Sequence, residues 1–148
     1  DIVSGTVVEF EKDILHCKAK RTLPLSKEEI LKFAGRRNPF NHPCVMYRKE
    51  AVEKAGGYQH FYLFEDYYLW ARMLLLGVEA RNLPDTLLYM RAGTGMYKRR
   101  GGWKYVKSML HFRLFLWKSG LSSFGFCGLC RRSDDDLSDS EPLKRTVL

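Results

Sequence analysis

The sequence has 148 residues, which fits a single domain and is long enough to bury a hydrophobic core. Hydrophobic residues make up 45% and aromatic residues 14% of the chain, a composition typical of a globular protein rather than a disordered one. The formal net charge is +8, and no acidic residue occurs from Thr86 to Ser133. Such a basic segment favours a phosphate-bearing partner, whether nucleotide, lipid headgroup or nucleic acid.

The two ends of the chain differ in character. The chain begins at Asp1, directly in the strand-like alternation of residues 2–10, so we expect a piece of a longer protein. Its longest apolar region, residues 106–130, is interrupted by charged side chains and is not expected to cross a membrane. Residues 124–148, which are rich in Ser and Asp from Arg131 onward, are expected to form a disordered tail.

The predicted elements alternate between strands and helices with short connections. The first half contains a strand over 2–11, a loop over 12–25, a helix over 27–34 with a capping box at Ser26 and Glu29, and a shaped loop over 38–43. A short buried strand over 44–47 and a helix over 48–55 follow. The second half contains a helix that begins at Glu65 and Asp66 and ends at Gly77, strands over 78–83 and 86–91 separated by a turn, and a helix over 103–118. This order predicts an α/β layer architecture.

Two adjacent carboxylates, Glu65 and Asp66, open one of the most apolar helices of the chain. The helix macrodipole stabilises an ionised carboxylate in the first turn, which suits a catalytic base. Consecutive helical residues point roughly 100° apart, so the two acids cannot both flank one bond. We take Asp66 as the candidate base and Glu65 as its orienter or as a ligand for a sugar hydroxyl. The alternative is that Asp66 only caps the helix.

Further polar residues could contribute to a site. Asn38, Asn41 and His42 combine amides and an imidazole on a rigid loop, which suits hydrogen bonds to a polyol, although the loop could equally be a structural turn. A basic run, Lys98, Arg99 and Arg100, could neutralise a diphosphate leaving group or could simply be the solvated start of a helix. No metal centre is predicted, because the CxxC motif at 127–130 has no second ligand pair.

Four stretches of the chain together resemble the family 2 glycosyltransferases of GT-A fold, especially the bacterial enzymes that build capsule, exopolysaccharide or O-antigen repeat units. The stretches are residues 1–10, 38–49, 56–70 and 88–91. The resemblance implies an α/β fold, namely the C-terminal part of a GT-A domain with a mixed sheet and flanking helices. Residues 1–123 would form its acceptor-binding part, and the N-terminal nucleotide-binding half with the metal-binding DxD motif is absent.

The resemblance also implies an activity, a glycosyltransferase of hexosyltransferase type. A sugar would pass from a nucleotide-diphosphate donor to a hydroxyl of a saccharide or lipid-linked saccharide, with inversion, in cell-surface polysaccharide biosynthesis. Asp66 matches the aspartate of the family's ED motif, the general base, and Glu65 precedes it. The expected acceptor-binding residues are Asn38, Asn41, His42 and Trp70. The expected diphosphate-binding residues are Arg91, Lys98, Arg99 and Arg100.

Three further expectations concern the cation, the activity of this chain alone and its location. A divalent cation, Mn²⁺ or Mg²⁺, is expected in the full-length enzyme with ligands mostly outside this chain. We expect this chain alone not to turn over sugar nucleotide. The expected location is the cytoplasm, at the inner face of the membrane.

The alternative function is a membrane-surface binding module or a non-catalytic remnant. The helix over 103–118 contains Trp, Phe, Lys and Arg and would lie on an anionic membrane surface. Both functions can coexist if the acceptor is lipid-linked. Nucleic acid is not an expected partner, because no nucleic-acid motif is present and the aromatic residues of this helix fit the spacing of a core.

Overall fold

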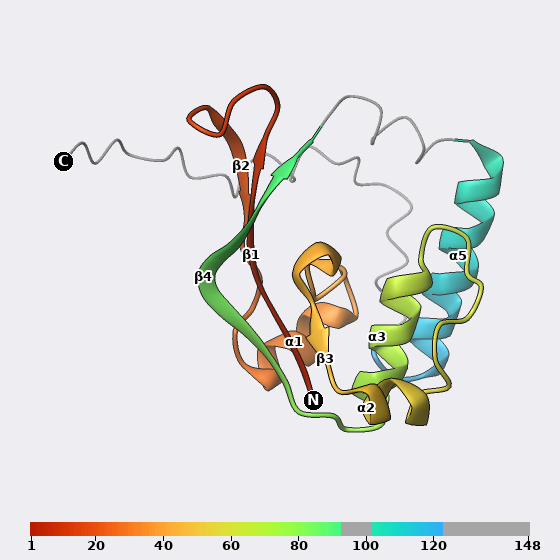
Figure 1. Cartoon of the computed structure of the whole chain (residues 1–148). Helices are drawn as coiled ribbons and strands as arrows, with labels where there is room; N and C mark the ends of the chain where they lie inside the picture. Colours follow the sequence, from red (N-terminus) through yellow and green to blue (C-terminus); the bar gives the residue numbers. More distant parts are fainter. Residues whose placement is uncertain (93–101, 123–148) are drawn as a thin grey trace.

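The computed structural model describes residues 1–92 and 102–122. Its elements in chain order are β1 (Ile2–Phe10), β2 (Cys17–Arg21), α1 (Lys27–Ala34), the 3-10 helix η1 (His42–Cys44), β3 (Met46–Tyr47), α2 (Lys49–Lys54), α3 (Glu65–Leu75), β4 (Ala80–Arg91) and α5 (Trp103–Lys118). In Figure 1 the sheet lies on one side, α3 and α5 lie side by side on the other, and α1 lies between. The predicted fold class, a mixed sheet with flanking helices, is confirmed.

Strand β1 is the centre of the sheet. It pairs with β4 in parallel along its whole length, from Ile2 opposite Ala80 to Phe10 opposite Arg91. Its other edge is shared by two antiparallel partners, β3 at its beginning and β2 at its end. All residues of β1 except Val3 are buried, as expected of a central strand that is covered on both faces.

Three strand predictions were wrong. The predicted turn at Pro84 and Asp85 is an irregularity inside one strand, β4, because the proline lacks an N–H for the ladder and the pairing with β1 shifts there. The predicted loop over 12–25 contains β2, whose alternating lysines hid its strand pattern. The predicted buried strand over 44–47 is the short β3, which is open to solvent because it pairs with only two residues of β1; Met46 is 72% exposed.

Two helix predictions are confirmed. Helix α1 spans Lys27–Ala34, and its capping box is formed: the Glu29 N–H donates to Ser26 Oγ, and the Ser26 N–H donates to Glu29 Oε2. Helix α5 has the predicted bounds, Trp103–Lys118. Both boundaries follow from local signals, a capping pair in one case and glycines before the helix in the other.

Helix α3 carries two separate hydrophobic clusters on two of its faces. Leu69, Trp70, Met73 and Leu74 pack toward β1, α1 and α2. Tyr67 and Ala71 pack on the other face against α5. As expected of one of the most apolar helices of the chain, α3 is buried over most of its length, but Leu75 and Leu76 at its end are exposed.

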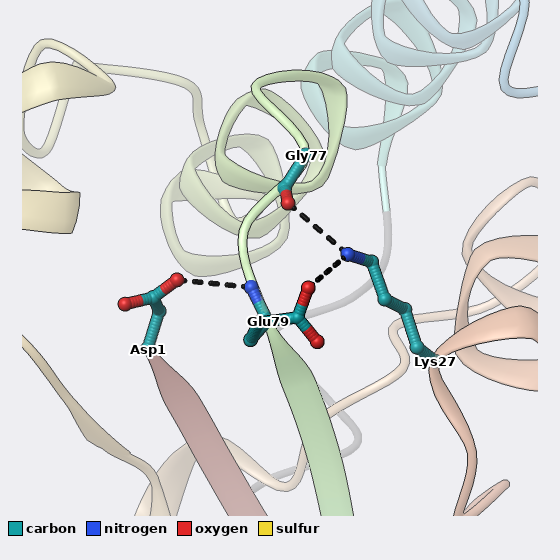
Figure 2. A network of polar contacts seen from close by, with 4 residues as sticks. All are labelled: Asp1, Lys27, Gly77 and Glu79. Atoms are coloured by element: carbon teal, nitrogen blue, oxygen red, sulfur yellow. Dashed lines mark hydrogen bonds and ion pairs between the residues drawn. The ribbon is translucent and has the colours of Figure 1, made fainter.

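Polar contacts fix the start of β1 against the turn between α3 and β4 (Figure 2). The Asp1 carboxylate accepts a hydrogen bond from the Glu79 N–H, with Oδ2 3.0 Å from the nitrogen. Lys27, the first residue of α1, donates to the Gly77 carbonyl at 3.1 Å and pairs with the Glu79 carboxylate at 2.6 Å. These contacts place α3 in a fixed position relative to the sheet and α1.

Candidate active site

The acidic pair forms the first two residues of α3. Leu63, two residues before Glu65, has a left-handed backbone with φ of 61°, a conformation that costs energy in a residue other than glycine. Its N–H donates to Glu65 Oε1 at 3.3 Å. Glu65 therefore supports the turn that leads into α3. By holding this turn, it helps to set the direction of the Asp66 side chain at the start of the helix.

Both carboxylate oxygens of Asp66 accept a hydrogen bond. Oδ1 accepts from the N–H of Tyr67 at 2.7 Å, and Oδ2 accepts from the amide nitrogen of Asn38 at 3.1 Å. The carboxylate is half-buried. The structure thus brings together two residues that the sequence singled out in separate stretches. It also shows a cap-like role, because the Tyr67 N–H is one of the amides that a helix start leaves without an intrahelical partner.

Aromatic rings gather beside this carboxylate, over the fully buried ring of Trp70. The ring of Trp70 lies 6.2 Å from His42, 5.7 Å from Tyr47 and 6.2 Å from Tyr58, centroid to centroid. Those three residues are exposed, so they form an open aromatic surface supported from below by Trp70.

The electrostatics of Tyr58 link this aromatic surface to Asp66. Partial burial raises the pKa of Tyr58 to about 12, and its neighbour Tyr47 and the charge of Asp66 add to the effect. The Tyr58 phenol therefore stays neutral at physiological pH and keeps its O–H as a hydrogen-bond donor. Open aromatic faces next to a carboxylate and a hydroxyl donor suit a sugar ring, which presents both apolar C–H faces and hydroxyls.

Two of the predicted acceptor-binding residues, Asn41 and Trp70, are buried. The buried Asn41 uses both hydrogens of its amide, donating to the Gly5 carbonyl at 2.8 Å and to the Arg21 carbonyl at 3.1 Å. It therefore anchors the 38–43 loop to the sheet. Trp70 is fully buried and supports the exposed rings, whereas Asn38 and His42 lie at the surface of the site.

Of the predicted diphosphate-binding residues, Arg91 is the one that the structure describes. Arg91 ends β4, and its guanidinium lies 5.4 Å from the centre of the Phe10 ring, at the opposite end of β1 from β3. The other three, Lys98, Arg99 and Arg100, lie outside the described residues. Within residues 1–92 and 102–122, no group of three or more His, Cys, Asp or Glu side chains is arranged to hold a metal ion.

Sequence reasoning did not select Tyr47 and Tyr58 as site residues. Tyr58 follows the two left-handed glycines Gly56 and Gly57, and this turn is held by Arg72 of α3, which donates to the carbonyls of Ala55 and Gly57. The glycine pair signalled a turn, but no local pattern showed that the turn would bring its tyrosine next to Asp66.

Comparison with known proteins finds that this chain is similar to bacterial glycosyltransferases. The amylovoran biosynthesis glycosyltransferase AmsE of Erwinia amylovora is 45% identical over 127 residues, covering 84% of this chain and 46% of that protein. A glycosyltransferase of Haemophilus influenzae is 44% identical over 124 residues, covering 84% of this chain and 45% of that protein.

A third relative carries a more specific name. The UDP-Gal:alpha-D-GlcNAc-diphosphoundecaprenol beta-1,3-galactosyltransferase of Escherichia coli is 39% identical over 115 residues, covering 75% of this chain and 42% of that protein. The chain is thus homologous to glycosyltransferases of polysaccharide biosynthesis, and it spans less than half the length of these three relatives. No family model matches the sequence, and no solved structure matches it.

Proposed function

We propose that this chain supplies the acceptor side of an inverting family 2 glycosyltransferase of GT-A fold. The observation that carries the proposal is the Asp66 carboxylate, held by Asn38 and Tyr67 beside the exposed rings of Tyr47 and Tyr58. The names of the relatives support sugar transfer in polysaccharide biosynthesis. The donor would be a nucleotide-diphosphate sugar.

In the proposed reaction, Asp66 removes the proton of the acceptor hydroxyl. The hydroxyl oxygen forms a bond to the anomeric carbon of the donor from the face opposite the diphosphate. The bond between the anomeric carbon and the diphosphate oxygen breaks, and its electron pair leaves with the nucleotide diphosphate. Asn38 keeps Oδ2 of Asp66 in a fixed direction, and the tyrosines hold the acceptor ring. Positioned proton removal of this kind contributes about 10² to 10⁴ in rate.

The acceptor class and location follow from the same homology. One relative is named for an acceptor carried on a lipid diphosphate, so we propose a lipid-linked saccharide acceptor here. Its use would place the protein in the cytoplasm at the inner face of the membrane. A divalent cation remains part of the proposal, but the described residues offer no group to hold it, and no step is assigned to it.

The test is the exchange of Asp66 for asparagine in the protein that includes its nucleotide-binding half. Asp66→Asn keeps the size of the side chain but cannot take a proton, so transfer should fall by about 10² to 10⁴ while donor affinity, measured by calorimetry, is unchanged. Asn38→Ala, which frees the carboxylate, should lower kcat more than it changes KM. The matched control is Glu53→Gln on α2, which removes an exposed carboxylate that pairs with Lys49. Undiminished turnover by Asp66→Asn would refute the assignment.

A second experiment concerns the 148 residues alone. Because the match covers less than half the length of these relatives, we propose that this chain does not turn over sugar nucleotide by itself. Isothermal titration with UDP-galactose and Mn²⁺ should show no tight binding. Tight binding that depends on Mn²⁺ would contradict the proposal and would place the donor site within this chain.

A further inference from the structure

Helix α5 uses only one of its faces to join the rest of the molecule. Its buried residues are Ser108, Phe112 and Leu116, spaced four apart, so they form a single row along the helix. Phe112 and Leu116 pack against α3, and Ser108 Oγ donates to the Tyr62 carbonyl at 2.8 Å. Contacts on either side of this row widen the attached face: Arg113 donates to the Gly35 and Arg36 carbonyls, and the ring of Tyr105 stacks on that of Phe64.

The opposite face of α5 is apolar and open. At about 100° per residue, five side chains fall within roughly 80° of one another on this face. They are Trp103, Val106, Leu110, Leu114 and Trp117. Trp103 is 80% exposed, and an open hollow of about 460 Å³ is lined by four of the five residues together with Lys107 and His111. Of the aromatic residues of α5, which fit the spacing of a core, Phe112 and Phe115 pack in a hydrophobic cluster, whereas Trp103 and Trp117 lie on the open face.

A band of basic side chains borders this apolar face on one flank. Lys104, Lys107 and Lys118 occupy adjoining positions around the helix, and α5 contains no acidic residue. The Nζ of Lys104 lies 4.3 Å from the centre of the Tyr62 ring. A second hollow, about 280 Å³, lies between this flank and residues 60–62, and it shares Lys107 and His111 with the first.

We propose that this face of α5 is a docking surface for an anionic lipid bilayer. The apolar row would enter the boundary between headgroups and acyl chains, and the lysine band would contact lipid phosphates. The proposal names the residues that would contact the membrane at which the proposed function places the protein. Its evidence is the surface of α5 alone.

Charge and length decide between possible occupants of the face. Two copies of this chain that met through the same face with their α5 helices antiparallel, about a twofold axis across the helices, would bring one lysine band close to the other, which is unfavourable. An anionic bilayer satisfies the apolar row and the lysines at once. No helix among the described residues is long and apolar enough to span a bilayer. The 16 residues of α5 measure about 24 Å, so it would lie in the plane of the interface.

The electrostatic part is tested by sedimentation of the 148-residue chain with vesicles. The chain should bind vesicles that contain phosphatidylglycerol far more tightly than vesicles of phosphatidylcholine alone. Removing three lysines should weaken binding to the anionic vesicles roughly 100-fold, since each contributes about fivefold. The variant is Lys104→Gln/Lys107→Gln/Lys118→Gln, and the control with the same loss of charge on α1 and α2 is Lys32→Gln/Lys49→Gln/Lys54→Gln.

The apolar part needs a second pair of variants. Leu110→Ser/Leu114→Ser should weaken vesicle binding about tenfold. The matched control is Leu75→Ser/Leu76→Ser at the end of α3, where the leucines are 44% and 60% exposed against 37% and 44% on α5. Brominated lipids should quench the fluorescence of wild-type Trp103 but quench the Trp103→Phe variant less. Circular dichroism melting establishes that each variant is folded.

Several results would overturn the proposal. Equal binding to both kinds of vesicle would remove the anionic surface, and equal losses in a variant and its control would remove α5 as the contact. Self-association that Leu110→Ser/Leu114→Ser abolishes, without vesicle binding by the wild type, would assign the face to a second copy. The assay contains no sugar or nucleotide, so its outcome is independent of whether the proposed transfer reaction is correct.

Discussion

Tyr67 shows how one residue can link the site helix to its surroundings. Its phenol O–H donates to the Ala34 carbonyl at the end of α1, with an O–O distance of 2.6 Å. The ring is buried against Phe112 of α5. Burial of the phenol raises the pKa of Tyr67 above its ordinary value, because the charged form would lose hydration. Since Tyr67 directly follows Asp66, this contact also fixes the N–H that binds the Asp66 carboxylate.

A prediction about alkaline stability follows from the raised pKa of Tyr67. The folded state holds the phenolic proton more tightly than the unfolded state, so this contribution is complete below the ordinary value of 10.0 and is lost as the pH rises above it. Tyr67→Phe should lower the free energy of unfolding by about 1–3 kcal/mol at neutral pH, because the Ala34 carbonyl loses its partner.

The pH profile separates this effect from simple loss of packing. In urea unfolding, the wild type should lose up to about 1.4 kcal/mol per pH unit above pH 10 through this group, and Tyr67→Phe should lack that component. Tyr89→Phe, on an exposed ring of β4, is the control and should leave neutral stability unchanged. Parallel alkaline profiles for wild type and Tyr67→Phe would contradict the assignment.

The residues of the site were only partly predictable from the sequence. Asp66 and Asn38 could be selected because their chemistry and local setting are visible in sequence, and their contact is present. Tyr47 and Tyr58 could not, because they meet through the ring of Trp70, a contact between separate segments. The buried position of Asn41 depends likewise on carbonyls of β1 and β2 that approach it only in the folded chain.

At the scale of elements, boundaries were easier to predict than partners. The capping box of Ser26 and Glu29 defined α1, because capping depends on residues within one turn. Strand β2 carries alternating lysines and is a strand only because β1 offers it an edge, which no local pattern records. In α5 the buried row of Ser108, Phe112 and Leu116 is set by packing against α3, which no local pattern in the sequence records.

At the scale of the whole molecule, α3 joins two otherwise separate hydrophobic clusters. The larger one includes side chains from β1, α1, α2, α3 and β4, and the smaller one joins α3 to α5. Phe112 is the centre of the smaller cluster, with ring centroids 5.0 Å from Phe64 and 4.6 Å from Tyr67. Because Phe64 immediately precedes Glu65, the proposed membrane helix rests on the segment that leads into the acidic pair.

This arrangement predicts that α5 can be released without unfolding the sheet. Phe112→Ala should cost about 3–5 kcal/mol, as expected for a buried aromatic ring, and most of that cost falls on the smaller cluster. Amide hydrogen exchange should therefore lose protection in α5 much more than in β1. Leu110→Ala, on the exposed face of the same helix, should change stability by less than about 0.5 kcal/mol. An equal loss of protection in β1 and α5 would instead mean that both clusters unfold as one cooperative unit, so that α5 could not loosen at a membrane without disturbing Asp66.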